Sequence, residues 1–140
     1  MTSLFVITAA LQTAVPALAP EPHWRVAPVT AGYWTWRTFP GGSEALFSTP
    51  LGVQFTIRCT LASRTVSLLR TGAVPGRATV VRTTSLERTL PATGTLGARD
   101  PLLDAVAFTR GRWSVEVAGA PRLILPSWPE PVRAVEDCRK

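Results

Sequence analysis

Two arginines on either side of a glycine, in the stretch TRGR at residues 109–112, have the most distinctive binding chemistry in this sequence. An arginine guanidinium presents its N–H donors as a fork that fits a carboxylate or a phosphate, so Arg110 and Arg112 are candidate ligand-binding residues. A structural role is the alternative, because the stretch follows an expected helix whose C-terminal dipole favours positive charge, with Glu116 or Asp137 as ion partners. Both interpretations stay open at this point.

The residue types on which most enzymes rely are sparse. His23, the one histidine, precedes the expected folded part, which argues against a serine–histidine or cysteine–histidine relay. Two cysteines and one histidine do not have zinc-site spacing, and no glycine-rich phosphate loop follows an expected strand. The sequence therefore predicts no catalytic residue, no metal site and no cofactor.

The carboxylates have structural explanations that fit their positions. Asp100 precedes Pro101, which is the pattern of a helix N-cap followed by proline in the first turn. Glu136 and Asp137 are expected on a solvent-facing side, with Arg133 and Arg139 near enough to pair with them. An acid/base pair is accordingly not expected among them.

The charge balance is strongly basic, with 15 Lys and Arg against 9 Asp and Glu, a net charge of +6 and a pI near 11.0. Such a balance makes a polyanion a conceivable partner. The arginines are spread along the chain without interleaved aromatic residues, and no nucleic-acid-binding motif is present, so nucleic acid is not expected as a partner.

The elements that must position these residues are mainly strands. In GVQFTIRCTLA, residues 52–62, apolar and polar side chains alternate over nine residues, which predicts a strand with Cys59 on its inner face. Further strands are expected at 32–39, 45–48, 64–72, 77–90, 112–119 and 121–126, with a loop at 91–99. The pattern predicts a mainly β, α+β fold: an antiparallel sheet or sandwich with one short internal helix and a C-terminal helix.

Two helices are expected in the last forty residues. The first starts after Asp100 and is expected to stop at Gly111 as a left-handed cap. The second opens on a capping box formed by Ser127 and Glu130, and its apolar stripe is Trp128, Val132, Val135 and Cys138. Cys138 thus faces the core that Cys59 faces from the sheet, and the two cysteines are predicted to form a disulfide.

The start of the chain resembles an export signal. Residues 1–19 are mostly apolar, contain no stretch long enough to span a membrane as a helix, and end in Ala17–Leu18–Ala19, a small-x-small cleavage pattern. A proline-rich linker is expected at 20–31 and a single β-rich domain at 32–140. Four of the tryptophans, Trp34, Trp36, Trp113 and Trp128, are expected in the core, and Trp24, next to the proline-rich segment, is a candidate for an exposed position.

The segment DPLLDAVAFTRGRWSVEVAGAPRLILPSWPEPVRAVEDCR, residues 100–139, resembles the C-terminal signature of small uncharacterised exported proteins of alphaproteobacteria. That signature reads D-P-L-L-D-A-x-A-F-S-R-G-R-F, then L-P-x-W-x-E and E-D-C-R; here Thr109 replaces Ser and Trp113 replaces Phe. YWTWRTFPGGSEA and FTIRC extend the resemblance over residues 32–140. It implies export and no particular activity. The chain is also loosely similar to periplasmic β domains of the invasion-associated locus B type.

Together these features predict a non-enzymatic binding domain of the periplasm or the secreted fraction, acting on a component or protein of the cell envelope. One alternative is an inhibitor of a hydrolase such as lysozyme, although lysozyme is also basic and like charges oppose association. The other alternative is an envelope enzyme that uses arginines and carboxylates.

Overall fold

The computed structural model describes residues 14–16, 19–91 and 93–140. Most of the expected signal peptide, including Ala17 and Leu18 of its cleavage pattern, lies outside the described residues. Among those that are described, no helix has both the length and the apolar character needed to cross a membrane.

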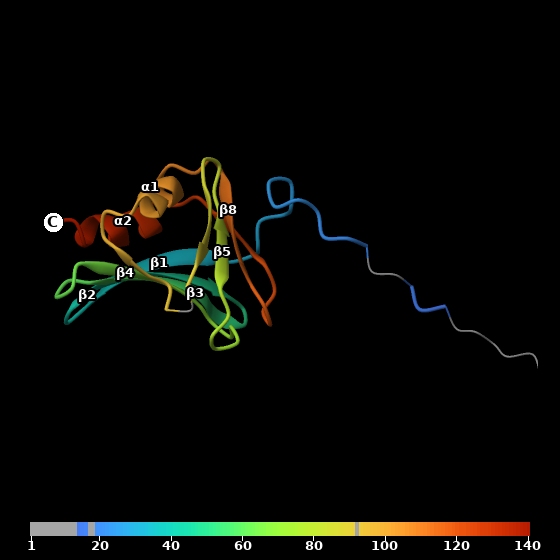
Figure 1. Cartoon of the computed structure of the whole chain (residues 1–140), viewed down its shortest axis with the longest axis horizontal. Helices are drawn as coiled ribbons and strands as arrows, with labels where there is room; N and C mark the ends of the chain where they lie inside the picture. Colours follow the sequence, from blue (N-terminus) through green and yellow to red (C-terminus); the bar gives the residue numbers. More distant parts are fainter. Residues whose placement is uncertain (1–13, 17–18, 92) are drawn as a thin grey trace, which may run out of the picture.

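In the described part of the chain, strands form two antiparallel sheets. The first sheet has the order β1 (Tyr33–Phe39), β2 (Gly42–Thr49), β3 (Gly52–Thr60), β4 (Thr65–Arg70) and β7 (Thr95–Gly97). The second has the order β6 (Glu87–Leu90), β5 (Thr79–Arg82), β8 (Arg112–Val117) and β9 (Leu123–Pro126). Helices α1 (Pro101–Ala107) and α2 (Pro129–Asp137) lie over one face of the first sheet, and β5 and β8 stand beside them (Figure 1). The predicted mainly β fold with an internal and a C-terminal helix is confirmed.

The strand boundaries differ from the prediction in two places. The stretch 77–90 is a hairpin rather than one strand, because the Thr83 hydroxyl accepts a hydrogen bond from the Leu86 N–H and donates to the Leu86 carbonyl, which closes a turn between β5 and β6. The expected loop at 91–99 contains β7, which pairs with the open edge of β4. Both features depend on pairing partners and not on local periodicity.

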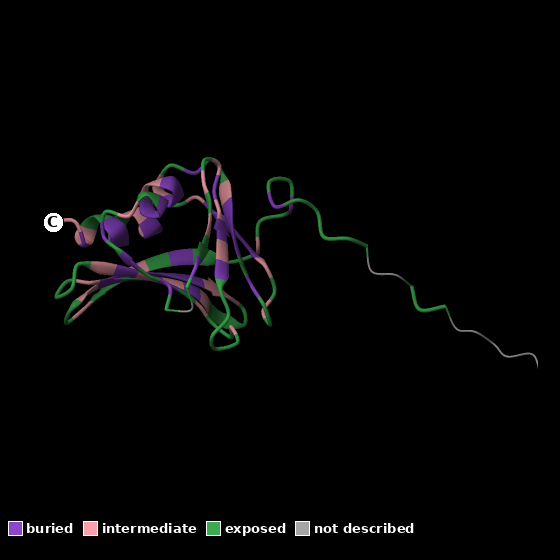
Figure 2. Ribbon diagram, in the orientation of Figure 1, coloured by how far each residue is buried: buried purple, intermediate pink, exposed green. Residues whose placement is uncertain are grey.

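The core lies between the sheets and the helices, where buried segments of all these elements meet (Figure 2). Trp34 stacks on Trp113 with 6.3 Å between ring centroids, and Phe55 packs edge-on against both rings. The indole N–H of Trp34 donates to the Pro126 carbonyl, so this buried polar group is satisfied. Trp34 and Trp113 are therefore core residues, as predicted.

Trp128 and Trp24 are placed differently from the prediction. Trp128 is exposed because it is the N-cap residue of α2 and not a member of its apolar stripe. Trp24 is buried against Ala27 and Ile124, because the segment before β1 lies along the second sheet. Trp36 is half-buried at the edge of the core.

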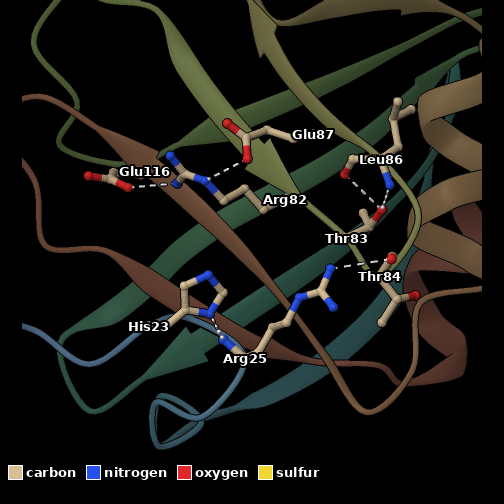
Figure 3. Close-up of polar contacts among 8 residues, drawn as sticks. All are labelled: His23, Arg25, Arg82, Thr83, Thr84, Leu86, Glu87 and Glu116. Carbon is tan, nitrogen blue, oxygen red and sulfur yellow. Dashed lines mark hydrogen bonds and ion pairs between the residues drawn. The ribbon is translucent and has the colours of Figure 1, made fainter.

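The segment expected to be a linker is tied to the domain by several hydrogen bonds. Thr30 and Ile124 exchange a pair: the Thr30 N–H donates to the Ile124 carbonyl, and the Ile124 N–H donates to the Thr30 hydroxyl. The Arg112 guanidinium donates to the Ala27 carbonyl, and that of Arg25 donates to the Thr84 carbonyl (Figure 3). Thr30 thus pairs with the outer edge of β9, while Ala27 and Arg25 contact β8 and the turn that follows β5.

The helix ends confirm one predicted cap and correct two. Asp100 caps α1, since its carboxylate accepts the Leu102 N–H at 2.9 Å. The helix ends at Ala107 with Phe108 as its C-cap, while Gly111, at φ +74°, serves the turn into β8 instead. The capping box is not formed: the Ser127 hydroxyl donates to the Thr109 carbonyl and does not cap α2.

The predicted disulfide between Cys59 and Cys138 is present, with the two Cα atoms 5.5 Å apart. Cys59 lies on the inner face of β3, and Cys138 directly follows α2. The alternation that predicts the inner face of β3 holds for Phe55, Ile57 and Cys59, while Val53 and Leu61 at its ends are exposed. A bulge between Phe47 and Ser48 shifts the register next to Val53, and the strand ends before Leu61.

Candidate functional site

An open groove of about 620 Å³, here called the first groove, lies where the β1–β2 hairpin meets the C-terminal part of α2. Its walls come from three parts of the chain: the β1–β2 hairpin, the turn between β3 and β4, and the end of α2. The lining residues are Trp36, Thr38, Gly42, Ser43, Leu61, Arg64, Arg133, Asp137 and Lys140. Strand alternation places Trp36, Thr38 and Ser43 on the side of the first sheet that carries α2.

Asp137 organises the polar side chains of the first groove. Its Oδ2 accepts the Ser43 hydroxyl at 2.7 Å and the Trp36 indole N–H at 3.1 Å, and its Oδ1 accepts the Lys140 ammonium at 2.9 Å. Burial disfavours the charged carboxylate, but the hydrogen bonds from Ser43, Lys140 and Trp36 outweigh it and hold the pKa of Asp137 below its ordinary value. Asp137 is therefore an ionised anchor in the groove, and its ion partner is Lys140 rather than the expected Arg133 or Arg139.

Arg133 lies over the ring of Trp36, with the guanidinium carbon 3.4 Å from the ring centroid. A guanidinium on an indole face gains a cation–π attraction and is held in one orientation. Arg133 has no carboxylate within ion-pair distance among the described residues. Its donors are thus oriented and not engaged with an acid.

A second groove, of about 450 Å³, lies between the residues that follow α2 and the connection from β7 to α1. It shares Arg64 and Lys140 with the first groove, and its remaining lining residues are Gly97, Ala98, Arg99, Cys138 and Arg139. The Arg139 guanidinium donates to the Ala98 carbonyl at 2.7 Å and pairs with Asp104 at 2.9 Å. Its Nη2 is buried and has no hydrogen-bond acceptor among the described residues.

Arg64 stands between the two grooves in an uncommon backbone conformation. Its φ is +54°, and it is the one non-glycine residue of the described chain with a positive φ. Its guanidinium donates to the Cys138 carbonyl at 3.3 Å, and its own carbonyl accepts the Ala98 N–H at 3.0 Å. Left-handed backbone at a non-glycine residue carries strain and is found more often at functional positions.

Five cationic residues therefore surround the end of α2, and we call them the basic surface: Arg64, Arg99, Arg133, Arg139 and Lys140. Lys140 is paired with Asp137, and Arg139 with Asp104 and Glu136. The other three arginines have no carboxylate partner within the described residues. An excess of oriented, uncompensated donors in two adjoining grooves is suited to binding anionic groups.

The two arginines singled out by the sequence lie elsewhere and do not form one fork. Arg110 is exposed, and its backbone N–H donates to the Thr84 hydroxyl. The Arg112 guanidinium is engaged with the Ala27 carbonyl. Glu116, one of their expected partners, pairs with Arg82. Ligand binding by Arg110 and Arg112 stays a prediction.

Sequence reasoning missed Arg64 and Arg99 as site residues and treated Arg133 only as an ion-pair partner. Arg64 and Arg99 lie in short connections between regular elements, where no periodicity shows which way a side chain points. The spacing of α2 did place Arg133 and Asp137 one turn apart, and this is the one local signal that both line the same groove.

A second polar cluster, on the outer face of the second sheet, is internally neutralised. Arg82 lies between Glu87 and Glu116, at 3.1 Å and 2.7 Å, and the neighbouring Thr83 and Thr84 bind Leu86 and Arg25 (Figure 3). Its charged groups already have partners, so it offers less to a ligand than the basic surface does.

No family model, curated protein or solved structure matches this chain.

Proposed function

We propose that this chain is a non-enzymatic domain of the periplasm or the secreted fraction that binds an anionic component of the cell envelope through the basic surface. The observation that carries the proposal is the convergence of Arg64, Arg99 and Arg133 on two adjoining grooves without a carboxylate partner in the described chain. Fixed positive groups in concave sites raise the local concentration of anions and speed their association.

The disulfide supports a location outside the cytoplasm. Disulfides form and persist in oxidising compartments and are rare where thiols are kept reduced. Both cysteines of the chain are joined in this bond. The apolar, small-residue start of the chain supports the same location, since it has the pattern of an export signal.

Two of the carboxylates are unsuited to act as general acids near neutral pH. A general acid that works near neutral pH needs a raised pKa. Asp100 and Asp137 have a pKa below the ordinary value, because hydrogen bonds from Arg88 and Leu102, and from Ser43, Lys140 and Trp36, outweigh the effect of burial. Both are thereby fixed as ionised structural groups.

Binding is tested with purified protein from residue 20 onward and immobilised anionic polysaccharide over a salt series. We expect the apparent affinity to fall steeply with salt, and the Arg64→Asn plus Arg133→Gln double variant to lose at least about tenfold in affinity, since electrostatic contacts dominate such binding. Asparagine tolerates the left-handed backbone at position 64, so the fold is preserved.

The matched control is Arg25→Gln plus Arg77→Gln, which also removes two positive charges but at positions outside the basic surface. If the control loses as much affinity as the basic-surface variant, binding reflects net charge alone and the proposed site is wrong.

Export is tested by expressing the chain with its own N-terminus in a Gram-negative host. We expect it in the periplasm or the medium, shortened by about twenty residues. Leu11→Arg, which puts a charge in the apolar stretch, should leave it full-length in the cytoplasm. Wild-type protein that stays full-length in the cytoplasm with free thiols contradicts the proposal.

A further inference from the structure

Resting on the proposed function, we infer that the ligand is an acidic polysaccharide whose carboxylates are separated by hydroxyl-bearing sugar, and that one chain occupies both grooves at once. The inference uses three features of the basic surface: the two lining residues that the grooves share, the position of Arg133 over the Trp36 ring, and the presence of a carboxylate in the lining of one groove only.

The two grooves adjoin at the end of α2. Arg64 and Lys140 line both of them, and Arg64 donates to the carbonyl of Cys138, which lines the second groove. A linear ligand that passes these two side chains would reach from Arg133 in the first groove to Arg99 in the second. A single small anion would use one groove and leave the cations of the other unpaired.

The position of Arg133 over the Trp36 ring favours a ligand that carries a planar anionic group. Its guanidinium carbon lies 3.4 Å from the Trp36 centroid, so the ring covers one side of a group whose N–H donors pair with no carboxylate of the described chain. A carboxylate can accept two parallel N–H donors from such a fork. A uronate sugar carries this group on its ring.

The polar lining of the first groove favours a ligand with hydroxyl groups. Thr38 and Asp137 contribute oxygens, and Asp137 Oδ1 accepts only Lys140 among the described residues. An ionised carboxylate can accept further hydrogen bonds from hydroxyls. A polymer whose hydroxyl-bearing units separate its anions can place a hydroxyl donor at Asp137, which an ionised polyphosphate chain does not offer.

The lining of the second groove differs from that of the first, because it contains four cationic residues and no acidic one. Arg139 is already bonded to the Ala98 carbonyl and paired with Asp104, and Lys140 is paired with Asp137. Arg64 and Arg99 are thus the cations of this groove that have no carboxylate partner in the described chain. One carboxylate of the ligand is therefore assigned to each groove, with sugar hydroxyls near Asp137.

The experiment measures binding of galacturonate and of oligogalacturonates of increasing length to protein from residue 20 onward by calorimetry. We expect a rise of at least about 100-fold in affinity once the oligomer spans both grooves, because the second contact becomes intramolecular. Arg133→Gln and Arg99→Gln should each abolish most of this rise.

Arg133→Lys keeps the charge but removes the fork, and it should lose most of the oligomer affinity, while Arg77→Gln should lose none. Tighter binding of polyphosphate or single-stranded DNA of equal charge would overturn the inference and leave the proposed function standing. So would an affinity that does not depend on oligomer length. Absence of salt-sensitive binding to every anionic probe would instead overturn the proposed function itself.

Discussion

At the scale of single residues, Asp100 combines two roles that are normally separate. Its carboxylate caps α1 through the Leu102 N–H, and it forms a two-pronged pair with Arg88, whose Nη2 lies 2.9 Å from Oδ2. Burial disfavours the charge, but the hydrogen bonds from Arg88 and Leu102 hold the pKa of Asp100 below its ordinary value of 3.8. A carboxyl with a lowered pKa in the folded state stabilises the fold above its ordinary pKa and loses that effect as the pH falls through the folded value.

Asp100→Asn keeps a capping side chain and removes the charge. We expect a loss of about 1.5 kcal/mol in the free energy of unfolding at pH 7, from the charge-assisted bonds. The difference from wild type should narrow at about pH 3, below the ordinary pKa. Urea unfolding at the two pH values measures this, with the exposed Glu87→Gln as a near-neutral control. An equal difference at both pH values would contradict the assignment.

A glycine is needed at position 42 because the backbones of β2 and β3 approach each other closely there. A Cβ at this position would lie 1.9 Å from the Cys59 carbonyl oxygen, which belongs to the neighbouring strand. Gly42→Ala should therefore force β2 and β3 apart beside the disulfide and lower the free energy of unfolding by about 3 kcal/mol.

Gly97→Ala is the matched control for Gly42→Ala, because a Cβ at position 97 meets no atom within 4 Å. The measurement is the midpoint temperature of thermal unfolding of each of the two variants. Equal midpoints for both variants would contradict the prediction, because they would show that β2 and β3 can move apart at little cost in free energy.

At the scale of elements, the segment 23–30 acts as a strap along the second sheet, and its Thr30 bonds to the outer edge of β9. Exposed strand edges are prone to pair with other chains, and a covering segment blocks this. The strap is held by the cluster of Trp24, Ala27 and Ile124 and by the hydrogen bonds between Thr30 and Ile124. This cluster is separate from the main core, so the strap can open without global unfolding.

Trp24→Ala should loosen the strap more than it destabilises the domain. We expect hydrogen exchange at the Thr30 and Ile124 amides to rise at least about tenfold, while the loss of global stability stays well below that of Trp113→Ala in the main core, about 3–5 kcal/mol. Val26→Ala, at an exposed position of the same segment, is the control. Unchanged exchange in Trp24→Ala would mean that the hydrogen bonds alone hold the strap.

At the scale of the whole molecule, the disulfide joins a strand of the first sheet to the end of the last helix across 79 residues of sequence. It holds the very segment that supplies Asp137, Arg139 and Lys140 to the two grooves. Stability and the geometry of the basic surface are therefore coupled through one bond.

Replacing both cysteines by serine should lower the free energy of unfolding by about 4–5 kcal/mol on the chain-entropy account of a loop of this length. It should also weaken binding of anionic polysaccharide, because the end of α2 frays. Urea unfolding and the binding assay are run on the same samples, with oxidised wild type as the reference. Full affinity in a destabilised variant would separate the two effects and contradict the coupling.

The sequence by itself determined the features that depend on local periodicity. Alternation in β3 and the spacing of α2 each fix side-chain direction, and from these the inner positions of Cys59 and Cys138, and hence their disulfide, followed. Only the tertiary structure decided the strap, the pairing of β7 with β4, and the assembly of the basic surface. These join residues far apart in the chain through connections such as Arg64 and Arg99, where no repeating pattern dictates direction and only packing against distant elements sets it.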